Sequence, residues 1–320
     1  MGAHRLAGLD GSSVVVEVPA SSANLGAGYD CLGVAIALTN RIELEVRVWS
    51  RGEIELTVDG EGRNELTEDR ENRFVRGLEA ALRMALGSLP DEVGWRIRMR
   101  NQIPLSRGLG SSAAATVGGV LAGNALAGEP LSTADMLRLA TDIEEHPDNA
   151  AAVLLGGFVV SASTPSGVEA IRIDAPRELR AVLFIPDLRL STRAMRAALP
   201  AQVPLADAVA NLSAVAVGVA GLATGRFELL GRLTVDRLHE PYRALVYPQL
   251  PRMVAAARDA GALGACLSGA GSTIIAFTDN AVGAKALEAG LTEAAAAADL
   301  PGRARTVELR NTGAQVVAQA

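Results

Sequence analysis

The chain has 320 residues, enough for one large domain or two of ordinary size. Apolar residues make up 49% and charged residues 21%, the mixture of a soluble globular protein. The net charge of −6 argues against a nucleic-acid or anionic-membrane partner, and two cysteines and three histidines argue against a disulfide scaffold or a histidine-rich metal centre.

The opening segment, MGAHRLAGLDG, lacks the apolar stretch of a secretion signal, so we expect a cytoplasmic protein. Uncharged runs at 150–168 and 260–278 are interrupted by glycine and serine, and they predict core and loops rather than membrane spans. Lys285 is the single lysine, and it has no neighbouring Ser or Thr. A Walker-type phosphate loop, which requires Gly-Lys-Ser/Thr, is therefore not expected.

The first hundred residues show apolar residues at every second position, the pattern of strands with one buried face. This alternation predicts strands over 14–18, 42–48, 54–58 and 95–99. Between the third and fourth strands, apolar residues recur every four positions over 74–86 and predict a helix.

A loop rich in proline and glycine, 103–112, leads into a predicted helix of small residues and then a third helix near 132–145. The segment STPSG at 163–167 is the best linker signal in the chain. Beyond it, the pattern predicts strands over 181–186, 273–278 and 306–309, and helices over 191–199, 207–222, 247–260 and 281–297. We therefore predict an α+β protein of two domains, 1–165 and 166–320.

The strongest chemical signal is PLSRGLGSSAA at 104–114. Its two glycines allow the backbone to turn tightly and approach a ligand closely. Two serines then begin a helix, whose first turn carries unpaired N–H groups and the positive end of the helix dipole. The segment is a candidate phosphate site whose hydroxyls could also reach Mg²⁺, and the alternative is an ordinary glycine-rich loop with a serine cap.

This segment resembles the phosphate-binding motif of the GHMP kinases, which hold ATP without a Walker lysine. Two further motifs of that superfamily follow the same order, VPASSANLGAGYDCLG at 18–33 and LSGAGS at 267–272. Within the superfamily, four segments resemble those of the homoserine kinases. They are the motif at 18–33, EEHPDN at 144–149, TRAMR at 192–196 and LHEPYR at 238–243. The resemblance covers essentially the whole chain.

The resemblance implies an α+β, two-domain GHMP kinase fold, with an N-terminal domain like the second domain of ribosomal protein S5 and a ferredoxin-like C-terminal domain. It implies transfer of the γ-phosphoryl group of ATP to the hydroxyl of L-homoserine, with Mg²⁺, in threonine biosynthesis in the cytoplasm. A homodimer is a family expectation. The nucleotide residues that it implies are Asn72, Pro104, Arg107, Gly108, Leu109, Gly110, Ser111, Ser112 and Ala113.

Two of these assignments leave alternatives open. Asn72 could be the cap of the helix that follows it rather than a nucleotide contact. The resemblance places Mg²⁺ on Ser112 and Glu144, and one carboxylate with a hydroxyl, phosphate oxygens and water is a plausible magnesium shell. Asp142 and Glu145 are neighbouring carboxylates that could take the place of Glu144.

A zwitterionic substrate needs a cation for its carboxylate and an anion for its ammonium group. Arg196 and Arg243 resemble two family arginines that clamp the carboxylate, which a guanidinium can bind with two hydrogen bonds. Asp30 is expected to bind the ammonium group. Asn24 and Asn149 are expected to orient the substrate and its hydroxyl.

The resemblance implies catalytic roles for Asn149, Ser112 and Glu144. In mevalonate kinase an aspartate takes the place of Asn149 as the proposed base, but an amide is too weak a base. The proton is therefore expected to leave through phosphate or water, with Asp148 and His146 as less favoured bases.

Two other functions remain open. The chain could be another GHMP kinase of the mevalonate or shikimate type, but those substrates have no ammonium group for Asp30 to bind. It could also be a sensor that keeps the fold and binds its ligands without turnover, although Ser111, Ser112 and Glu144 argue against that.

Overall fold

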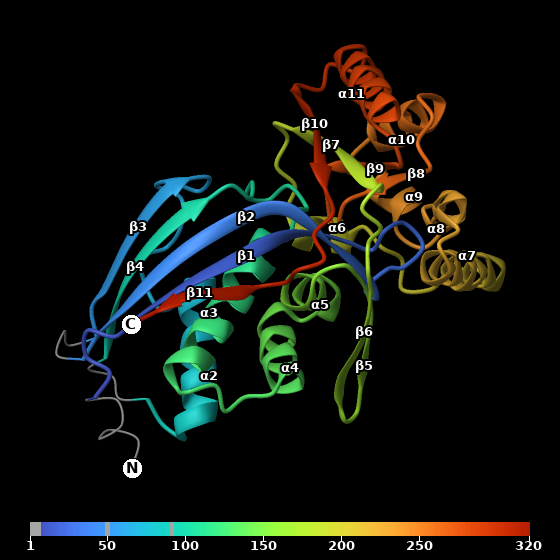
Figure 1. The fold of residues 1–320 in the computed structure, drawn as a ribbon. Helices are drawn as coiled ribbons and strands as arrows, with labels where there is room; N and C mark the ends of the chain where they lie inside the picture. The colour runs from blue at the N-terminus through green and yellow to red at the C-terminus, as the bar shows by residue number, and fades with distance from the viewer. Residues whose placement is uncertain (1–7, 49–51, 90–92) are drawn as a thin grey trace.

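The computed structural model describes residues 8–48, 52–89 and 93–320, so most of the opening segment inspected for a secretion signal lies outside it. The described chain forms two sheets, each with helices packed against it (Figure 1). The α+β class predicted from the alternating patterns is confirmed.

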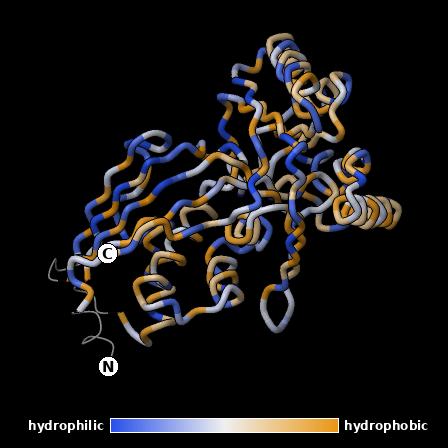
Figure 2. Tube along the Cα trace, in the orientation of Figure 1, coloured by the Kyte–Doolittle hydropathy of each residue, from blue (hydrophilic) through white to orange (hydrophobic). Residues whose placement is uncertain are grey.

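The larger sheet has the order β11-β1-β2-β4-β3, and β5 and β6 branch from β2. Its strands are β1 (Ser13–Ala23), β2 (Leu32–Arg47), β3 (Ile54–Gly60), β4 (Gly94–Asn101), β5 (Phe158–Thr164), β6 (Gly167–Ile173) and β11 (Gln315–Gln319). All pairs are antiparallel except β3 with β4. Hydropathy alternates along these strands (Figure 2), and the inward side chains Val14, Val16 and Val18 are fully buried.

Four helices cover one face of the larger sheet (Figure 1). They are α2 (Arg73–Leu86), α3 (Ser111–Leu126), α4 (Thr133–Glu144) and α5 (Pro147–Leu155). Glycine makes the close approach of α2 and α3 possible, because a Cβ on Gly119 would lie 2.0 Å from the Phe74 carbonyl oxygen. This packing fixes the start of α3, which carries the phosphate-site candidate.

The smaller sheet is antiparallel with the order β10-β7-β9-β8. Its strands are β7 (Arg180–Pro186), β8 (Gly264–Leu267), β9 (Ile274–Thr278) and β10 (Gly302–Glu308). The helices of this half are α6 (Thr192–Ala197), α7 (Leu205–Thr224), η1 (Phe227–Leu229), α8 (Leu230–Leu233), α9 (Glu240–Arg243), α10 (Leu250–Asp259) and α11 (Ala281–Ala296). The last two pack on the sheet, around the buried residues Leu267 and Leu287.

The strands and helices expected from periodicity are confirmed, but the linker expected at 163–167 is wrong. Thr164 pairs with Gly167, so this segment is the tight turn of the β5–β6 hairpin. Ser, Pro and Gly favour such turns as strongly as they favour linkers. The expected division at residues 165/166 falls inside this hairpin. Strand β11, near the end of the chain, also belongs to the larger sheet, so that sheet contains residues from both sides of the expected division.

Among the described residues, one helix, α7, is long and apolar enough to cross a membrane by length and composition alone. Its most apolar window has a mean hydropathy of 1.7, and 22% of that window is buried. Figure 2 shows this helix as a largely apolar segment at the edge of the molecule. A single helix of this kind is weak evidence for a membrane protein.

Candidate active site

A cavity of about 590 Å³ collects residues from all three glycine-containing motifs. Of the predicted site residues, those lining it are Asn24, Pro104, Arg107, Gly108, Leu109, Gly110, Ser111, Ser112, Ala113, Glu144, Asn149, Arg196 and Arg243. Asp30 and Asn72 are not among them. Segments far apart in sequence meet here: the Asn24 amide donates to the carbonyl oxygen of Gly269, 245 residues away.

The LSGAGS motif packs directly against the backbone of the phosphate-loop candidate. Gly108 has φ +75°, and a Cβ there would lie 2.1 Å from the Ser268 carbonyl oxygen. The Ser268 hydroxyl lies 2.7 Å from the Gly108 carbonyl oxygen, and the Thr273 N–H donates to the Arg107 carbonyl oxygen at 3.1 Å. The close approach of the Ser268 carbonyl leaves no room for a side chain at position 108, which explains the glycine there.

The N-terminus of α3 is open toward the cavity. Gly110, with φ +68°, occupies the N-cap position, and among the described residues no side chain caps the helix. The alternative of an ordinary serine cap is therefore wrong, because Ser111 and Ser112 lie inside the first turn. The unpaired N–H groups and the helix dipole of this turn favour an anionic ligand in the cavity.

Glu144 lies beside Ser112 at one side of this helix end. The Ser112 hydroxyl donates to Glu144 Oε1 at 2.9 Å, the Thr116 hydroxyl donates to the same oxygen at 2.6 Å, and Arg73 Nη1 lies 3.7 Å away. The Glu144 side chain is only 13% exposed. Thr116 and Arg73 were not predicted, although Thr116 follows Ser112 by four residues and therefore shares its helix face.

The alternative carboxylates are placed less favourably for the cavity. Asp142 is exposed and, within the described ranges, does not line the cavity, whereas Glu145 lines it as the left-handed residue that ends α4. No group of three or more His, Cys, Asp or Glu side chains in the described chain could hold a metal by itself. A single carboxylate with hydroxyls fits Mg²⁺, which commonly takes its other ligands from substrate phosphates and water.

Arg243 reaches the opposite side of the cavity from α9 and is 1% exposed. Its Nη1 group donates to the Gly269 carbonyl oxygen at 2.9 Å and to His239 Nδ1 at 3.0 Å. Its buried Nε has no hydrogen-bond partner among the described residues. A buried N–H of a guanidinium without an acceptor indicates a site for an anionic or carbonyl ligand.

Arg196 is held differently, because it forms an ion pair with Asp30. Its Nη2 and Nη1 donate to the two Asp30 carboxylate oxygens at 2.7 and 3.0 Å, and Nη1 also donates to the Tyr29 hydroxyl at 2.6 Å. The Tyr29 ring lies 5.4 Å from both the Arg196 and the Arg243 guanidinium carbons. Tyr29 belongs to the N-terminal motif, but the motif predicts no role for it, because only the fold places its ring against the two arginines.

The two predicted asparagines have well-defined partners. The Asn24 side-chain carbonyl accepts the Asp30 N–H at 3.0 Å, so it fixes the loop that carries Asp30. The Asn149 side-chain carbonyl accepts the Ser21 hydroxyl at 2.8 Å. Next to Asn149, burial is the main factor that raises the pKa of Asp148 to about 6, and the charge of Asp30 raises it further.

Two predicted nucleotide residues have structural roles in this fold. The Asn72 side chain accepts the Phe74 N–H at 3.0 Å, so it is the cap of α2, and it also lines a second cavity of about 310 Å³ that adjoins the phosphate-loop candidate. The Arg107 guanidinium donates to the carbonyl oxygens of Pro186 and Asp187 at 2.7 and 3.0 Å. It therefore ties this loop to the end of β7.

Comparison with known proteins gives consistent results. The GHMP kinases N-terminal domain model matches residues 72–157, and the GHMP kinases C-terminal model matches residues 219–297. A homoserine kinase from Moorella thermoacetica is 45% identical over 268 residues, 82% of this chain and 86% of that relative. A homoserine kinase from Parasynechococcus marenigrum is 41% identical over 95% of each chain.

A crystal structure of homoserine kinase from Cytophaga hutchinsonii superposes with a TM-score of 0.84 at 30% identity. The match covers 95% of this chain and 97% of that one. These matches confirm the two-domain fold that the motifs predicted.

Proposed function

Because this chain belongs to the GHMP kinase family and, within it, to the homoserine kinases, we propose that it transfers the γ-phosphoryl group of ATP to the side-chain hydroxyl of L-homoserine. The observation that carries this proposal is one cavity in which an uncapped helix N-terminus faces two arginines. The helix end suits a polyphosphate, and the arginines suit the carboxylate of an amino acid.

The ATP phosphates bind at the first turn of α3, where the N–H groups of 110–113 are available. The adjoining cavity of about 310 Å³ takes the nucleoside base. Its lining combines the apolar side chains Leu66, Met99 and Leu105 with the amide of Asn72, the mixture that suits a flat, partly polar ring.

Mg²⁺ is held by the Glu144 carboxylate and the Ser112 hydroxyl together with phosphate oxygens. When bound, the metal neutralises the charge that develops on the transferred phosphoryl group. Thr116 and Arg73 contact the same Glu144 oxygen, so they orient the carboxylate.

Homoserine binds by breaking the Asp30–Arg196 ion pair and giving each of the two side chains a new partner of opposite charge. Its carboxylate binds Arg243 and Arg196, and its ammonium group binds Asp30. A carboxylic acid without an ammonium group would take Arg196 and leave the Asp30 carboxylate with only the His146 ring, whose Nε2 lies 3.6 Å away. Because a half-buried carboxylate that loses its guanidinium partner is costly, this site favours amino acids over mevalonate-type acids.

Phosphoryl transfer depends mainly on positioning and on neutralising charge. Asn149, held by Ser21, orients the substrate hydroxyl but cannot accept its proton. The proton leaves through the transferred phosphate or water, as expected for a site whose central polar group is an amide. The proposal also includes a place in threonine biosynthesis, a cytoplasmic location and a homodimer, all of which rest on the resemblance.

The test measures ADP release with ATP and four acceptors: L-homoserine, 4-hydroxybutyrate, 3-aminopropan-1-ol and mevalonate. We expect turnover with homoserine only, and its loss when a chelator removes Mg²⁺. The second and third acceptors each lack one charged group of homoserine, so they report separately on Asp30 and on the arginines. Turnover with mevalonate alone would overturn the proposal, and ligand binding without ADP release would indicate a sensor.

A further inference from the structure

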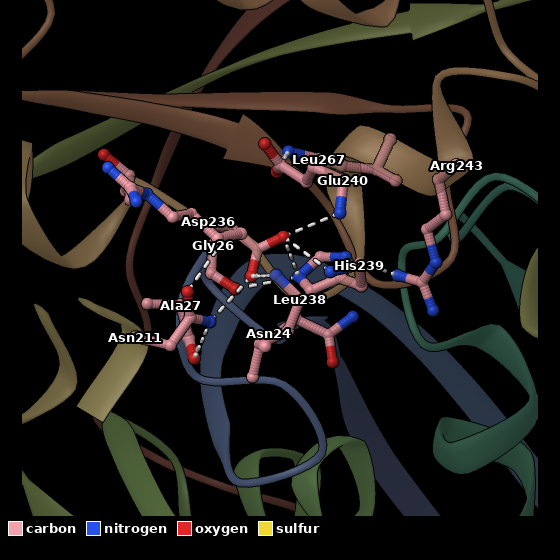
Figure 3. A network of polar contacts seen from close by, with 12 residues as sticks. Asn24, Gly26, Ala27, Asn211, Asp236, Leu238, His239, Glu240, Arg243 and Leu267 are labelled. Carbon is pink, nitrogen blue, oxygen red and sulfur yellow. Dashed lines mark hydrogen bonds and ion pairs between the residues drawn. The ribbon is translucent and has the colours of Figure 1, made fainter. Parts of the chain in front are cut away.

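A buried polar network lies directly behind Arg243 (Figure 3). Its centre is Asp236, whose side chain is fully buried. One Asp236 oxygen accepts the N–H of Leu238 at 3.0 Å and the side-chain amide of Asn211 at 2.8 Å; the other accepts the N–H groups of His239 and Glu240 at 2.8 and 2.6 Å. These four hydrogen bonds fix the turn that leads into α9, the short helix that carries Arg243.

The His239 ring lies between this turn and the Arg243 side chain (Figure 3). Its Nε2 is 2.8 Å from the Gly26 carbonyl oxygen, and its Nδ1 is 3.0 Å from Arg243 Nη1. A carbonyl oxygen can only accept, and a guanidinium nitrogen can only donate. His239 must therefore carry its proton on Nε2 and accept the Arg243 hydrogen bond at Nδ1.

Burial of the ring favours the same neutral form. Burial, foremost, lowers the pKa of His239, the positive charge of Arg243 lowers it further, and the carboxylates of Asp236 and Asp30 act in the opposite direction. A proton on Nδ1 would point at the guanidinium and break the contact. The neutral ring is thus the only form that accepts a hydrogen bond from Arg243.

Arg243 depends on this contact for its orientation. Its Nη1 donates only to His239 and to the Gly269 carbonyl oxygen, while its Nε remains without a partner in the described part of the chain. The Gly26 carbonyl that holds His239 belongs to the same loop as Asn24 and Asp30. The His239 ring therefore fixes the position of the Arg243 guanidinium relative to the loop of Asp30, which is proposed to bind the ammonium group of the substrate.

We propose that His239 is a positioning residue: as the Nε2-protonated tautomer bridging Gly26 and Arg243, it fixes the Arg243 guanidinium so that its remaining edge meets the substrate carboxylate. The inference rests on the proposed function, because it takes that carboxylate to be homoserine's. His239 itself has no contact with the substrate in this scheme.

A matched pair of variants tests the two ring nitrogens separately. In His239→Asn, the amide oxygen can take the place of Nδ1 and accept from Arg243; in His239→Gln, the longer amide can donate to Gly26 but offers Arg243 no acceptor at the Nδ1 position. We expect the KM for homoserine to rise at least about tenfold in His239→Gln and clearly less in His239→Asn. The KM for ATP should stay near the wild-type value in both variants.

Equal increases in both variants, or no increase in either, would overturn the proposal, since a merely structural histidine would not distinguish them. Wild-type turnover with homoserine is measured alongside. If the wild type does not phosphorylate homoserine, the proposed function fails, whereas a wild type that does so, with equal variants, rejects only the role of His239.

Nitrogen NMR of histidine-labelled wild-type protein gives a second readout that needs no variant to be active. The chain has three histidines, so the His239 signals can be identified by loss in a variant or by elimination of the other two. At neutral pH we expect a protonated Nε2 and an unprotonated Nδ1 that shifts when homoserine binds. A protonated Nδ1 would overturn the proposal even if neither variant folds.

Discussion

At the scale of single residues, the two arginines of the cavity lie in opposite electrostatic surroundings. Arg196 is half-buried and paired with Asp30, whereas Arg243 is 1% exposed and makes its hydrogen bonds to neutral acceptors. Among the described residues, no carboxylate forms an ion pair with Arg243, although the charges of Asp30 and Asp236 act on it from farther away. A buried charge without a directly paired counterion is costly by several kcal/mol, so burying Arg243 lowers the stability of the fold. Burial accordingly lowers the pKa of Arg243.

Replacing this cation by an apolar side chain should therefore separate stability from binding. We expect Arg243→Met to raise the melting temperature while the KM for homoserine rises at least about tenfold, since a charge-assisted contact with the carboxylate is lost. Thermal unfolding and steady-state kinetics measure the two effects. Arg196→Met is the control, because it removes both guanidinium hydrogen bonds of Asp30, leaves that carboxylate only the more distant His146 ring, and should lower the melting temperature. A less stable Arg243→Met protein would contradict the argument.

Asp148 offers a prediction about pH. Burial raises its pKa from 3.8 to about 6, so the folded protein holds this proton more tightly than the unfolded chain does. The stability contributed by this group is present below about pH 4 and is lost as the pH rises toward 6. We expect Asp148→Asn, which can still accept the Asn149 N–H, to be more stable than wild type at pH 8, by at most about 3 kcal/mol.

The gain should shrink toward zero when unfolding is measured at pH 4, where the wild-type carboxyl is also neutral. A constant difference between the two proteins from pH 4 to pH 8 would show that ionisation of Asp148 is not its cause. Because Asp148 lines the cavity, the same variant should also lose turnover with homoserine.

At the scale of elements, the phosphate-loop candidate depends on a backbone that passes against the LSGAGS turn. Gly108→Ala would place a methyl group against the Ser268 carbonyl oxygen in addition to the strain of a positive φ. Gly128 is a matched control, because its φ is +85° and a Cβ there would meet nothing within 4 Å. We expect Gly108→Ala to raise the KM for ATP at least about tenfold and Gly128→Ala to cost only about 1 kcal/mol of stability.

Helix α7 presents an apolar stripe to solvent, formed by Leu205, Val209, Leu212, Ala216 and Ala220. Their spacing of four, three, four and four residues places them along one face of the helix. The stripe runs along most of a 20-residue helix about 30 Å long, and an exposed apolar surface of this kind can mark an interaction site. The homodimer expected from the resemblance stays a prediction, and this stripe is the place to test it.

Leu212→Glu would put a charge at the centre of the stripe. If the stripe joins two copies, sedimentation should show a dimer for wild type and a shift toward monomer for the variant. Val282→Glu is the control, because Val282 is 80% exposed on α11 and lies outside the stripe. A wild-type monomer at all concentrations, or a dimer that survives Leu212→Glu, would reject α7 as the interface.

At the scale of the whole molecule, the chain returns to its starting point. Strand β11 pairs with β1 after the smaller sheet has been completed, with Val316 opposite Val16 (Figure 1). It covers what would otherwise be the exposed edge of the larger sheet, a site where chains aggregate. The two sheets are thus tied together by a pairing between the two ends of the sequence.

Removing residues 315–320 should lower the free energy of unfolding by about 2–5 kcal/mol, because a row of ladder hydrogen bonds is lost, and should promote aggregation. Denaturant unfolding and light scattering measure these effects. Val317→Ser is the control, since it removes a half-exposed side chain and keeps the ladder. A truncated protein as stable and soluble as wild type would mean that β11 contributes little.

The sequence by itself determined β1 to β4, β7, β9, β10 and the long helices, because local periodicity encodes them. It also marked the glycine-rich segment that is the phosphate-loop candidate. The periodicity missed other described elements: β5, β6, β8 and β11 among the strands, and α5, η1, α8 and α9 among the helices. β11 is stabilised by a distant partner, and β5 and β8 lie in uncharged runs without clear periodicity. The linker predicted at 163–167 was wrong because turns and linkers are rich in the same residue types.

Of the site, the sequence supplied nearly all the chemical groups, but only the tertiary structure decided what each one contacts. It turned Arg107 toward β7, made Asn72 a helix cap, and paired Asp30 with Arg196. It also placed His239 against Arg243. Hydrogen bonds and ion pairs depend on distances of a few ångströms between segments far apart in the chain, and no local pattern specifies those distances.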